Sequence, residues 1–207
     1  MNSALKSTEK YVLNLLSGKL PSEYYYHNID HTIDVVNTAK LIADNSNVSP
    51  TDTEMLLIAC WFHDSGLTQI YQGHEDISVI LAENFLFGIS YPQPKINIIK
   101  RIILATKMPH IPGDILEKII SDADISHMGK DNFDARSHQL RMEWEIVYNR
   151  TYSEEEWLDI NIRFLGDNLF FSDYCIQKMN PVRLKNLEIY KKRLYDLKKI
   201  NEKTYPR

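Results

Sequence analysis

The sequence contains few cysteines and no long apolar stretch. Cys60 and Cys175 are the only two cysteines among 207 residues, too few for a disulfide framework or a thiolate metal site. No segment approaches the roughly 20 consecutive apolar residues that a membrane helix needs, and the first residues lack the order of a secretory signal. We therefore expect a cytoplasmic protein with reduced thiols and no membrane partner.

Positive charge is also in short supply. Lys and Arg number 24 against 28 Asp and Glu, which gives a net charge of −4 and argues against a protein that coats nucleic acid. The exception is the segment 181–207, with nine basic residues against three acidic ones. Its leucines recur at helical spacing, so a solvated helix face explains this segment better than an anionic partner does.

Glycine is scarce, with 7 residues, and it falls where helices are expected to end. Apolar residues recur at helical spacing, and no alternating pattern indicates a strand. The predicted helices cover about residues 8–17, 30–44, 50–66, 74–87, 94–108, 114–129, 133–148, 153–165 and 181–200. This pattern predicts an all-α fold, a single compact helical bundle over residues 1–207.

Several histidines and acids fall on the inward faces of these helices. His31 shares a stripe with Val35 and Ile42, and His63-Asp64 follows the apolar third helix at the same spacing. Imidazole and carboxylate groups near apolar faces are costly unless they are paired or bind a metal, and bundle helices can converge on such a site. One such histidine alone is more often a hydrogen-bonded core residue. The order is more informative: a His, then His-Asp, then Asp-Ala-Asp about sixty residues later.

Three motifs in this order resemble the HD superfamily of metal-dependent phosphohydrolases. They are YHNIDH at 26–31, FHDSG at 62–66 and SDADI at 121–125. The resemblance covers roughly residues 24–130 and continues more loosely through residues 140–144. It implies one HD-type domain, with its motif core at about 24–130 and C-terminal helices over 133–201 packed on that core.

The resemblance also implies a ligand set for a divalent metal. Carried over residue by residue, the ligands are His31, His63, Asp64 and Asp124, with Asp64 also the natural bridging carboxylate and a catalytic residue. Helical periodicity does not separate Asp124 from Asp122, which is the fallback ligand. Nitrogen and oxygen ligands suit manganese, zinc, nickel, iron or magnesium without choosing among them, and one ion or two would fit the family.

The first motif is also similar to the opening segment of cyclic-nucleotide phosphodiesterases within this superfamily. There the earlier histidine protonates the leaving oxygen, and the analogy makes His27 a candidate general acid because imidazoles exchange protons near neutral pH. The alternative is that His27 only packs against the helix or caps it.

Further candidates depend on a second ion and on phosphate contacts. The segment GHEDIS at 73–78 resembles that of binuclear HD proteins, so His74 and His110 are candidates for a second metal or for substrate contact. Lys107 and Arg141 could bind phosphate because a fixed cation neutralises developing charge, although Arg141 also has an ion-pair partner at helical spacing. His127 and His138 lie outside every motif and are expected to be structural.

These observations predict a metal-dependent hydrolase of a phosphomonoester, pyrophosphate or cyclic phosphodiester, with a nucleotide-like small molecule as substrate. Two alternatives stay open at this point. One is a di-iron oxygenase of the HD fold, which would need both His74 and His110 as ligands. The other is a non-catalytic nucleotide-binding module. The sequence does not name the substrate or decide whether the chain forms a homo-oligomer.

Overall fold

The computed structural model describes residues 3–204, so the ends of the predicted domain, residues 1–2 and 205–207, lie outside the described part. Within it the chain forms ten α-helices and two short 3-10 helices, and no strand. The all-α prediction is confirmed. The elements are α1 (Ser3–Lys19), α2 (Ile29–Asp44), α3 (Pro50–Phe62), η1 (Ser65–Thr68), α4 (His74–Gly88), α5 (Gln93–Leu104), α6 (Ile115–Asp124), η2 (Ser126–Gly129), α7 (Phe133–Val147), α8 (Glu154–Asp167), α9 (Asp173–Lys178) and α10 (Asn180–Thr204).

Local capping determines where the helices that carry the site begin. The Asn28 side chain accepts a hydrogen bond from the backbone of His31 and so fixes the start of α2. Ser49 caps α3 with Pro50 in its first turn, and Asp114 accepts two backbone N–H bonds at the start of α6. These side chains satisfy N–H groups that have no partner inside the helix. The sequence therefore defines the first turns of three site-bearing helices.

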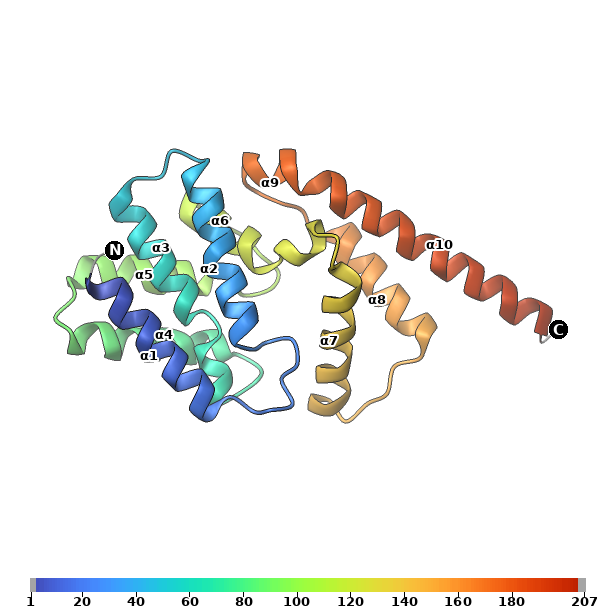
Figure 1. Cartoon of the computed structure of the whole chain (residues 1–207), viewed down its shortest axis with the longest axis horizontal. Coiled ribbons are helices and arrows are strands. Elements are labelled where there is room, and N and C mark those ends of the chain that lie inside the picture. The colour runs from blue at the N-terminus through green and yellow to red at the C-terminus, as the bar shows by residue number, and fades with distance from the viewer. Residues whose placement is uncertain (1–2, 205–207) are drawn as a thin grey trace.

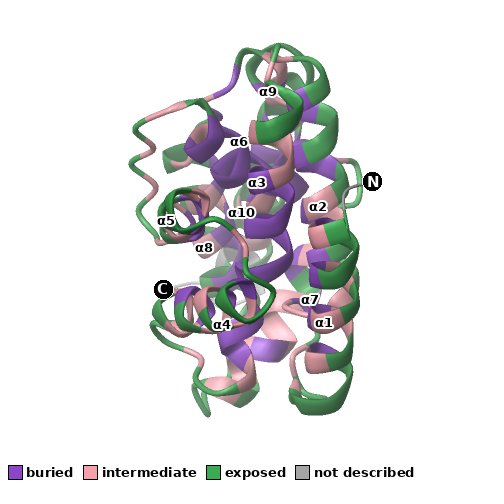
Figure 2. Cartoon of the chain, turned by 90° about the vertical axis from the view of Figure 1, so that its left-hand side faces the viewer, coloured by how far each residue is buried: buried purple, intermediate pink, exposed green. Residues whose placement is uncertain are grey.

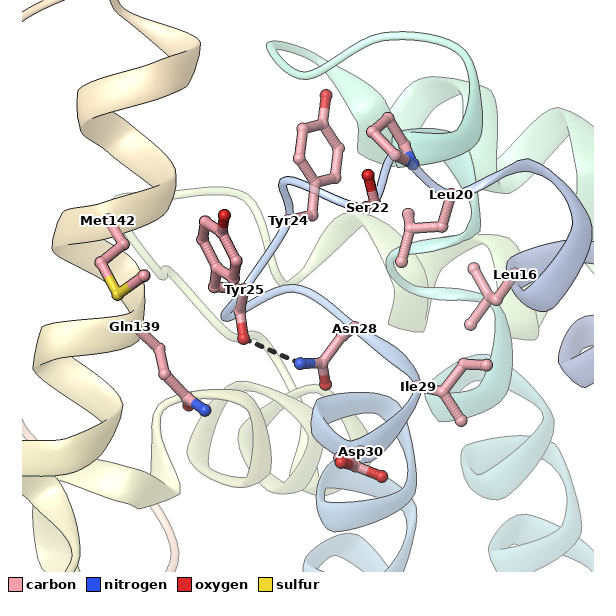
Figure 3. A pocket seen from close by; sticks show the side chains of 11 residues that line it. Leu16, Leu20, Ser22, Tyr24, Tyr25, Asn28, Ile29, Asp30, Gln139 and Met142 are labelled. Atoms are coloured by element: carbon pink, nitrogen blue, oxygen red, sulfur yellow. Dashed lines mark hydrogen bonds between the residues drawn. The ribbon is translucent and has the colours of Figure 1, made fainter.

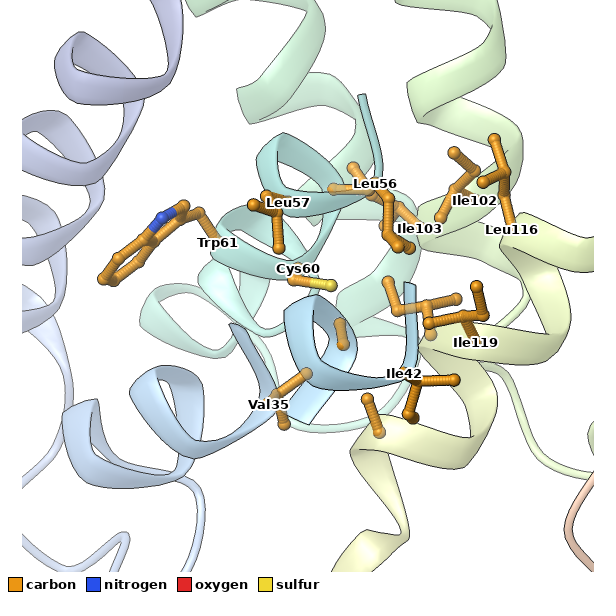
Figure 4. Packing of buried hydrophobic residues seen from close by; sticks show 14 of the residues in the cluster. Val35, Ile42, Leu56, Leu57, Cys60, Trp61, Ile102, Ile103, Leu116 and Ile119 are labelled. Carbon is orange, nitrogen blue, oxygen red and sulfur yellow. The ribbon is translucent and has the colours of Figure 1, made fainter. Parts of the chain in front are cut away.

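Much of the apolar core lies between α2, α3, α5 and α6 (Figure 4). Helix α3 is central, because eight consecutive residues over 55–62 are buried, and the buried colouring is concentrated along it in Figure 2. A helix that is apolar all round must lie inside the molecule. Its C-terminal end, and the His63-Asp64 pair that follows it, therefore lie at the centre of the bundle.

Helices α7, α8 and α10 lie on one side of the molecule, separate from α1, α4 and α5 (Figure 1). Helix α10 packs against α8, α9 and η2, and α7 contacts η2. None of the helices within residues 3–204 is sufficiently long and apolar to span a bilayer. The site is thus bounded by the motif-bearing helices on one side and by α7 on the other.

Three predicted helices end earlier than expected, and one helix was missed. The helix predicted over 94–108 is α5, which ends at Leu104. Helix α3 stops at Phe62 because the backbone leaves the helical region at Asp64, after which η1 begins. Helix α6 ends at Asp124 and the chain continues into η2 instead of one helix to Gly129. The short α9 starts at a Ser172 cap. At the ends of α3 and α6, the helix stops beside a carboxylate that the resemblance assigns to the metal.

Candidate metal centre

The ends of three helices bring the four predicted metal ligands together. His31 lies in the first turn of α2, His63 and Asp64 directly follow α3, and Asp124 is the last residue of α6. These three helices pack against one another. Because each of these residues lies at a helix end, its side chain can reach the other three ligands.

The polar atoms of these four side chains lie within a few ångströms of each other. Nε2 of His31 is 3.2 Å from Oδ1 of Asp124 and 3.4 Å from Oδ2 of Asp64. Nε2 of His63 is 3.2 Å from the same oxygen of Asp64 and 3.6 Å from Oδ1 of Asp124. One ligand atom each from His31, His63 and Asp124 lies within 4.8 Å of the others. This cluster could hold a divalent metal ion.

Two atoms of the centre are buried without a hydrogen bond. Nε2 of His63 and Oδ2 of Asp64 are both buried and unpartnered, although such atoms cost free energy when nothing satisfies them. Nδ1 of His63 lies 2.8 Å from the carbonyl of Cys60, a contact that requires the N–H to be there. Nε2 is therefore the nitrogen that could bind a metal after losing its proton, as in histidines that bind metal through one nitrogen and a carbonyl through the other. The donor set fits a divalent ion.

The imidazoles and carboxylates change one another's proton affinity. Burial opposes the charged form of His31 and His63, but the carboxylates of Asp124 and Asp64 still raise the pKa of both above the ordinary value. Burial would raise the pKa of the two acids, and the imidazoles instead hold it below the ordinary range. Both carboxylates are therefore ionised at neutral pH, the form in which they bind metal.

The structure distinguishes the two aspartates that the sequence left open. Asp122 is fully buried and points away from the cluster, where it accepts hydrogen bonds from the backbone of Phe171 and from the backbone and hydroxyl of Ser172, all at 2.6–2.8 Å. Its lone pairs are already used in holding the segment before α9. Asp124 is the aspartate that contacts the two histidines.

His74 lies beside the centre, at the start of α4. Its Nε2 is 3.2 Å from Oδ1 of Asp64, and its Nδ1 is 2.8 Å from the carbonyl of Tyr71. Although burial lowers its proton affinity, Asp64 raises the pKa of His74 to about 9. Gly66 allows this approach, because a Cβ there would lie 1.9 Å from the carbonyl oxygen of His74. Asp64 is thus the carboxylate that links His74 to His31 and His63.

His27 is held by a carboxylate that the sequence analysis did not single out. Nδ1 of His27 bonds to Oε1 of Glu143, a fully buried acid from α7. Glu143 also accepts bonds from the backbone of Tyr26 at 2.9 Å and of His27 at 3.0 Å, and from the hydroxyl of Tyr71 at 2.7 Å. Burial opposes ionisation of Glu143, but these bonds, with His27 first, keep its pKa below the ordinary value. In the sequence, the one indication of a role for Glu143 is its place in the segment 140–144, to which the resemblance to the HD superfamily loosely extends.

The ring of His27 lies close to the metal cluster. Its centroid is 5.7 Å from that of His31 and 6.5 Å from that of His74. With Nδ1 occupied by Glu143, Nε2 is the nitrogen that remains for proton transfer. Its side chain is 21% exposed, so a substrate could reach it from solvent.

His127 contacts the centre indirectly, through Tyr26. The hydroxyl of Tyr26 bonds to Nδ1 of His127 at 2.9 Å, and the ring of Tyr26 lies 4.8 Å from that of His31. Burial, followed by the charges of His31 and Arg136, lowers the pKa of His127 to about 3. His127 is therefore neutral and accepts the tyrosine hydrogen, and its ring lies nearly parallel to those of two phenylalanines.

The remaining predicted site residues lie apart from the cluster. His110 is in the loop after α5, where its Nε2 contacts the carbonyl of Thr106 at 3.1 Å and its Nδ1 is buried and unpartnered. Lys107 pairs with the exposed Asp76 at 2.7 Å. Arg141 binds Glu145, Glu154 and the carbonyl of Tyr152. The structure does not bring these three side chains to His31, His63 and Asp124.

Two cavities flank α7. One of about 180 Å³ lies between α7, α8 and α10 and includes Arg141 in its wall. The other, of about 600 Å³, is bordered by the loop before α2 and by α7, with Tyr24, Tyr25 and Met142 in its wall (Figure 3). Neither wall includes a residue of the metal cluster. The larger cavity adjoins the loop that carries His27.

Comparison with known proteins gives the family. Residues 28–129 match the family model of the HD domain, and the four residues of the cluster lie within that match. The chain carries an HD domain. HD domains bind divalent metals and are typical of metal-dependent phosphohydrolases. No curated protein matches the chain, and no solved structure matches it.

Proposed function

We propose that the HD domain of this chain hydrolyses a phosphate ester bond in a small molecule with the help of a divalent metal ion. The observation that carries the proposal is the cluster of two imidazoles and two carboxylates with its unpartnered atoms, Nε2 of His63 and Oδ2 of Asp64. A divalent ion bound there supplies a Lewis acid and a water whose pKa is lowered toward neutrality. His31, His63, Asp64 and Asp124 would hold it.

The second part of the proposal concerns the leaving group. A departing alkoxide needs a proton, and a positioned acid supplies it at the moment the bond breaks. Glu143 holds Nδ1 of His27 and so leaves Nε2 as the nitrogen that would deliver a proton to the leaving oxygen. After transfer, the neutral ring retains the bond from Nδ1 to Glu143.

Among the alternatives, the arrangement favours hydrolysis. A di-iron oxygenase would use His110 as a ligand, whereas this side chain lies in the loop after α5 and contacts a carbonyl of its own segment. The pair of His27 and Glu143 also suits proton transfer and has no evident purpose in a binding module. We therefore keep a phosphate ester, with a nucleotide-like molecule as the first class to assay, as the expected substrate.

The test compares metal content and hydrolysis in matched variants. Wild type, His63→Ala and Asp64→Ala are purified with manganese, zinc, nickel, iron or magnesium supplied, and each is assayed for bound metal and for phosphatase and phosphodiesterase activity. Asp122→Asn is the control, because Asp122 is as buried but lies outside the cluster. We expect metal and activity to be lost together in the first two variants and retained in the control. A wild type that binds no supplied metal would overturn the proposal.

A further inference from the structure

Three tyrosines from distant parts of the chain meet beside His27. Tyr24 comes from the loop before α2, Tyr71 from the loop before α4, and Tyr148 from the end of α7. The ring of Tyr71 lies 5.3 Å from that of Tyr24 and 5.9 Å from that of Tyr148, in edge-to-face contact with both. We call these three residues the tyrosine rim.

The tyrosine rim continues directly from the candidate acid. The rings of His27 and Tyr71 are 5.9 Å apart and nearly perpendicular, at 88°. If His27 protonates the leaving oxygen, the rest of the leaving group lies on the side of His27, next to these rings. The rim is accessible there: Tyr148 is 41% exposed, and Tyr24 and Tyr71 are half-buried.

The chemistry of the rim suits an uncharged flat group. Burial and the nearby Glu143 raise the pKa of Tyr71 and of Tyr24, so the phenols remain neutral. None of the cation–π contacts among residues 3–204 involves a rim ring. Faces and edges of neutral rings attract other planar rings, whereas a phosphate would be drawn to the metal cluster instead.

We propose that the tyrosine rim binds a planar ring carried by the leaving group of the substrate, and so selects esters of ring-bearing alcohols such as nucleosides. This inference rests on the proposed hydrolase function for the placement of the leaving group. The competing explanation is that the rim only covers Glu143, to which Tyr71 donates its hydrogen bond. Tyr148 separates the two, because it contacts Tyr71 and Trp144 and does not take part in the hydrogen bonds of Glu143.

The test measures binding of the leaving group without any reaction. Adenosine and ribose are the probes, titrated by ligand-observed NMR into metal-reconstituted wild type, Tyr148→Ala and Tyr148→Phe. Stacking on an aromatic side chain predicts that Tyr148→Ala weakens adenosine binding about five- to tenfold, that Tyr148→Phe restores it, and that ribose binds no variant better than another. Tyr195→Ala is the control, since Tyr195 is an exposed tyrosine of α10.

The kinetic arm uses adenosine 5′-monophosphate and ribose 5-phosphate, whose leaving oxygens are both primary alcohols. We expect the ratio of their kcat/KM values to favour the nucleotide in the wild type and to fall in Tyr148→Ala by the same factor as binding. Adenosine binding that depends on Tyr148 without any hydrolysis would support the rim and refute the hydrolase proposal. Hydrolysis of both esters with equal kcat/KM, or adenosine binding that is unchanged in Tyr148→Ala, would overturn the rim proposal.

Discussion

Replacing Glu143 by glutamine tests the proton-transfer half of the mechanism with little change in shape. The carboxylate accepts four hydrogen bonds: the backbone N–H groups of Tyr26 and His27 at one oxygen, and His27 Nδ1 and the hydroxyl of Tyr71 at the other. Glutamine has only one acceptor oxygen. That oxygen must serve the two backbone donors, because they cannot rotate away.

The amide nitrogen of the introduced glutamine would then face His27 and Tyr71. The hydroxyl can rotate, but His27 must move its hydrogen from Nδ1 to Nε2 to accept the amide donor. A neutral ring in that tautomer is a poor acid. Loss of a general acid or of its correct tautomer predicts that kcat for alkyl phosphate esters falls about 10²- to 10³-fold.

The assay compares leaving groups of different basicity. Esters of simple alcohols need protonation on departure, whereas 4-nitrophenolate does not, so Glu143→Gln should hydrolyse 4-nitrophenyl esters within about fivefold of the wild type. Metal content should be unchanged, and His27→Gln should show the same selective loss. Equal losses for both kinds of ester, or none for alkyl esters, would refute the role of His27 as acid.

Three other perturbations have expected outcomes that separate stability from chemistry. Asp122→Asn leaves buried donors of the segment before α9 without an acceptor, so we expect a loss of about 1–3 kcal/mol in the free energy of unfolding, by denaturant titration, with metal content unchanged; loss of metal would instead make Asp122 a ligand. Gly66→Ala places a Cβ against the carbonyl of His74 and should destabilise the protein by about 1–3 kcal/mol, whereas Gly88→Ala, with open space around it, should change stability little; equal effects would contradict the close approach. Burial lowers the pKa of His127 to about 3 in the folded state, against about 6.5 in the unfolded state. Below about pH 6.5 the unfolded state therefore binds a proton that the folded state does not bind, and stability falls as pH falls. The difference in unfolding free energy between wild type and His127→Leu should therefore shrink by about 2 kcal/mol from pH 7 to pH 5. A difference independent of pH would mean that the pKa of His127 is the same in the folded and unfolded states.

Local signals in the sequence predicted the fold, whereas the ligand set of the centre came from the resemblance to the HD superfamily. Caps such as Asn28 and Ser49 mark helix starts, and the apolar run of α3 requires burial. A His-Asp pair placed at the end of that helix must then lie inside the bundle. The choice between Asp122 and Asp124 was different. It depends on Ser172, fifty residues away, and no periodicity within α6 contains that information.

The sequence could not predict the role of Glu143 for a similar reason. Its function comes from contacts with residues more than seventy positions away, His27 and Tyr71, and from the packing of α7 against the loop before α2. The sequence drew attention to Arg141 in the same segment because a cation suits phosphate. Two residues along a helix do not share a face, and Arg141 lies instead among Glu145 and Glu154. The segment 140–144 therefore contains the partner of His27, whereas Arg141 lies on another face of the same helix.

The metal ligands of the proposed mechanism lie inside the segment that matches the HD domain, whereas the residues proposed for proton transfer lie outside it. All four candidate metal ligands lie within residues 28–129, the part that matches the family. His27 precedes that match and Glu143 follows it. The candidate acid and its hydrogen-bond partner therefore both lie outside the matched segment. The metal centre can be expected from family membership, whereas the acid depends on how α7 packs in this chain. The two proposals can therefore fail separately. If the protein binds metal but its hydrolysis does not depend on Glu143, the metal centre stands and the leaving group departs without a proton from His27.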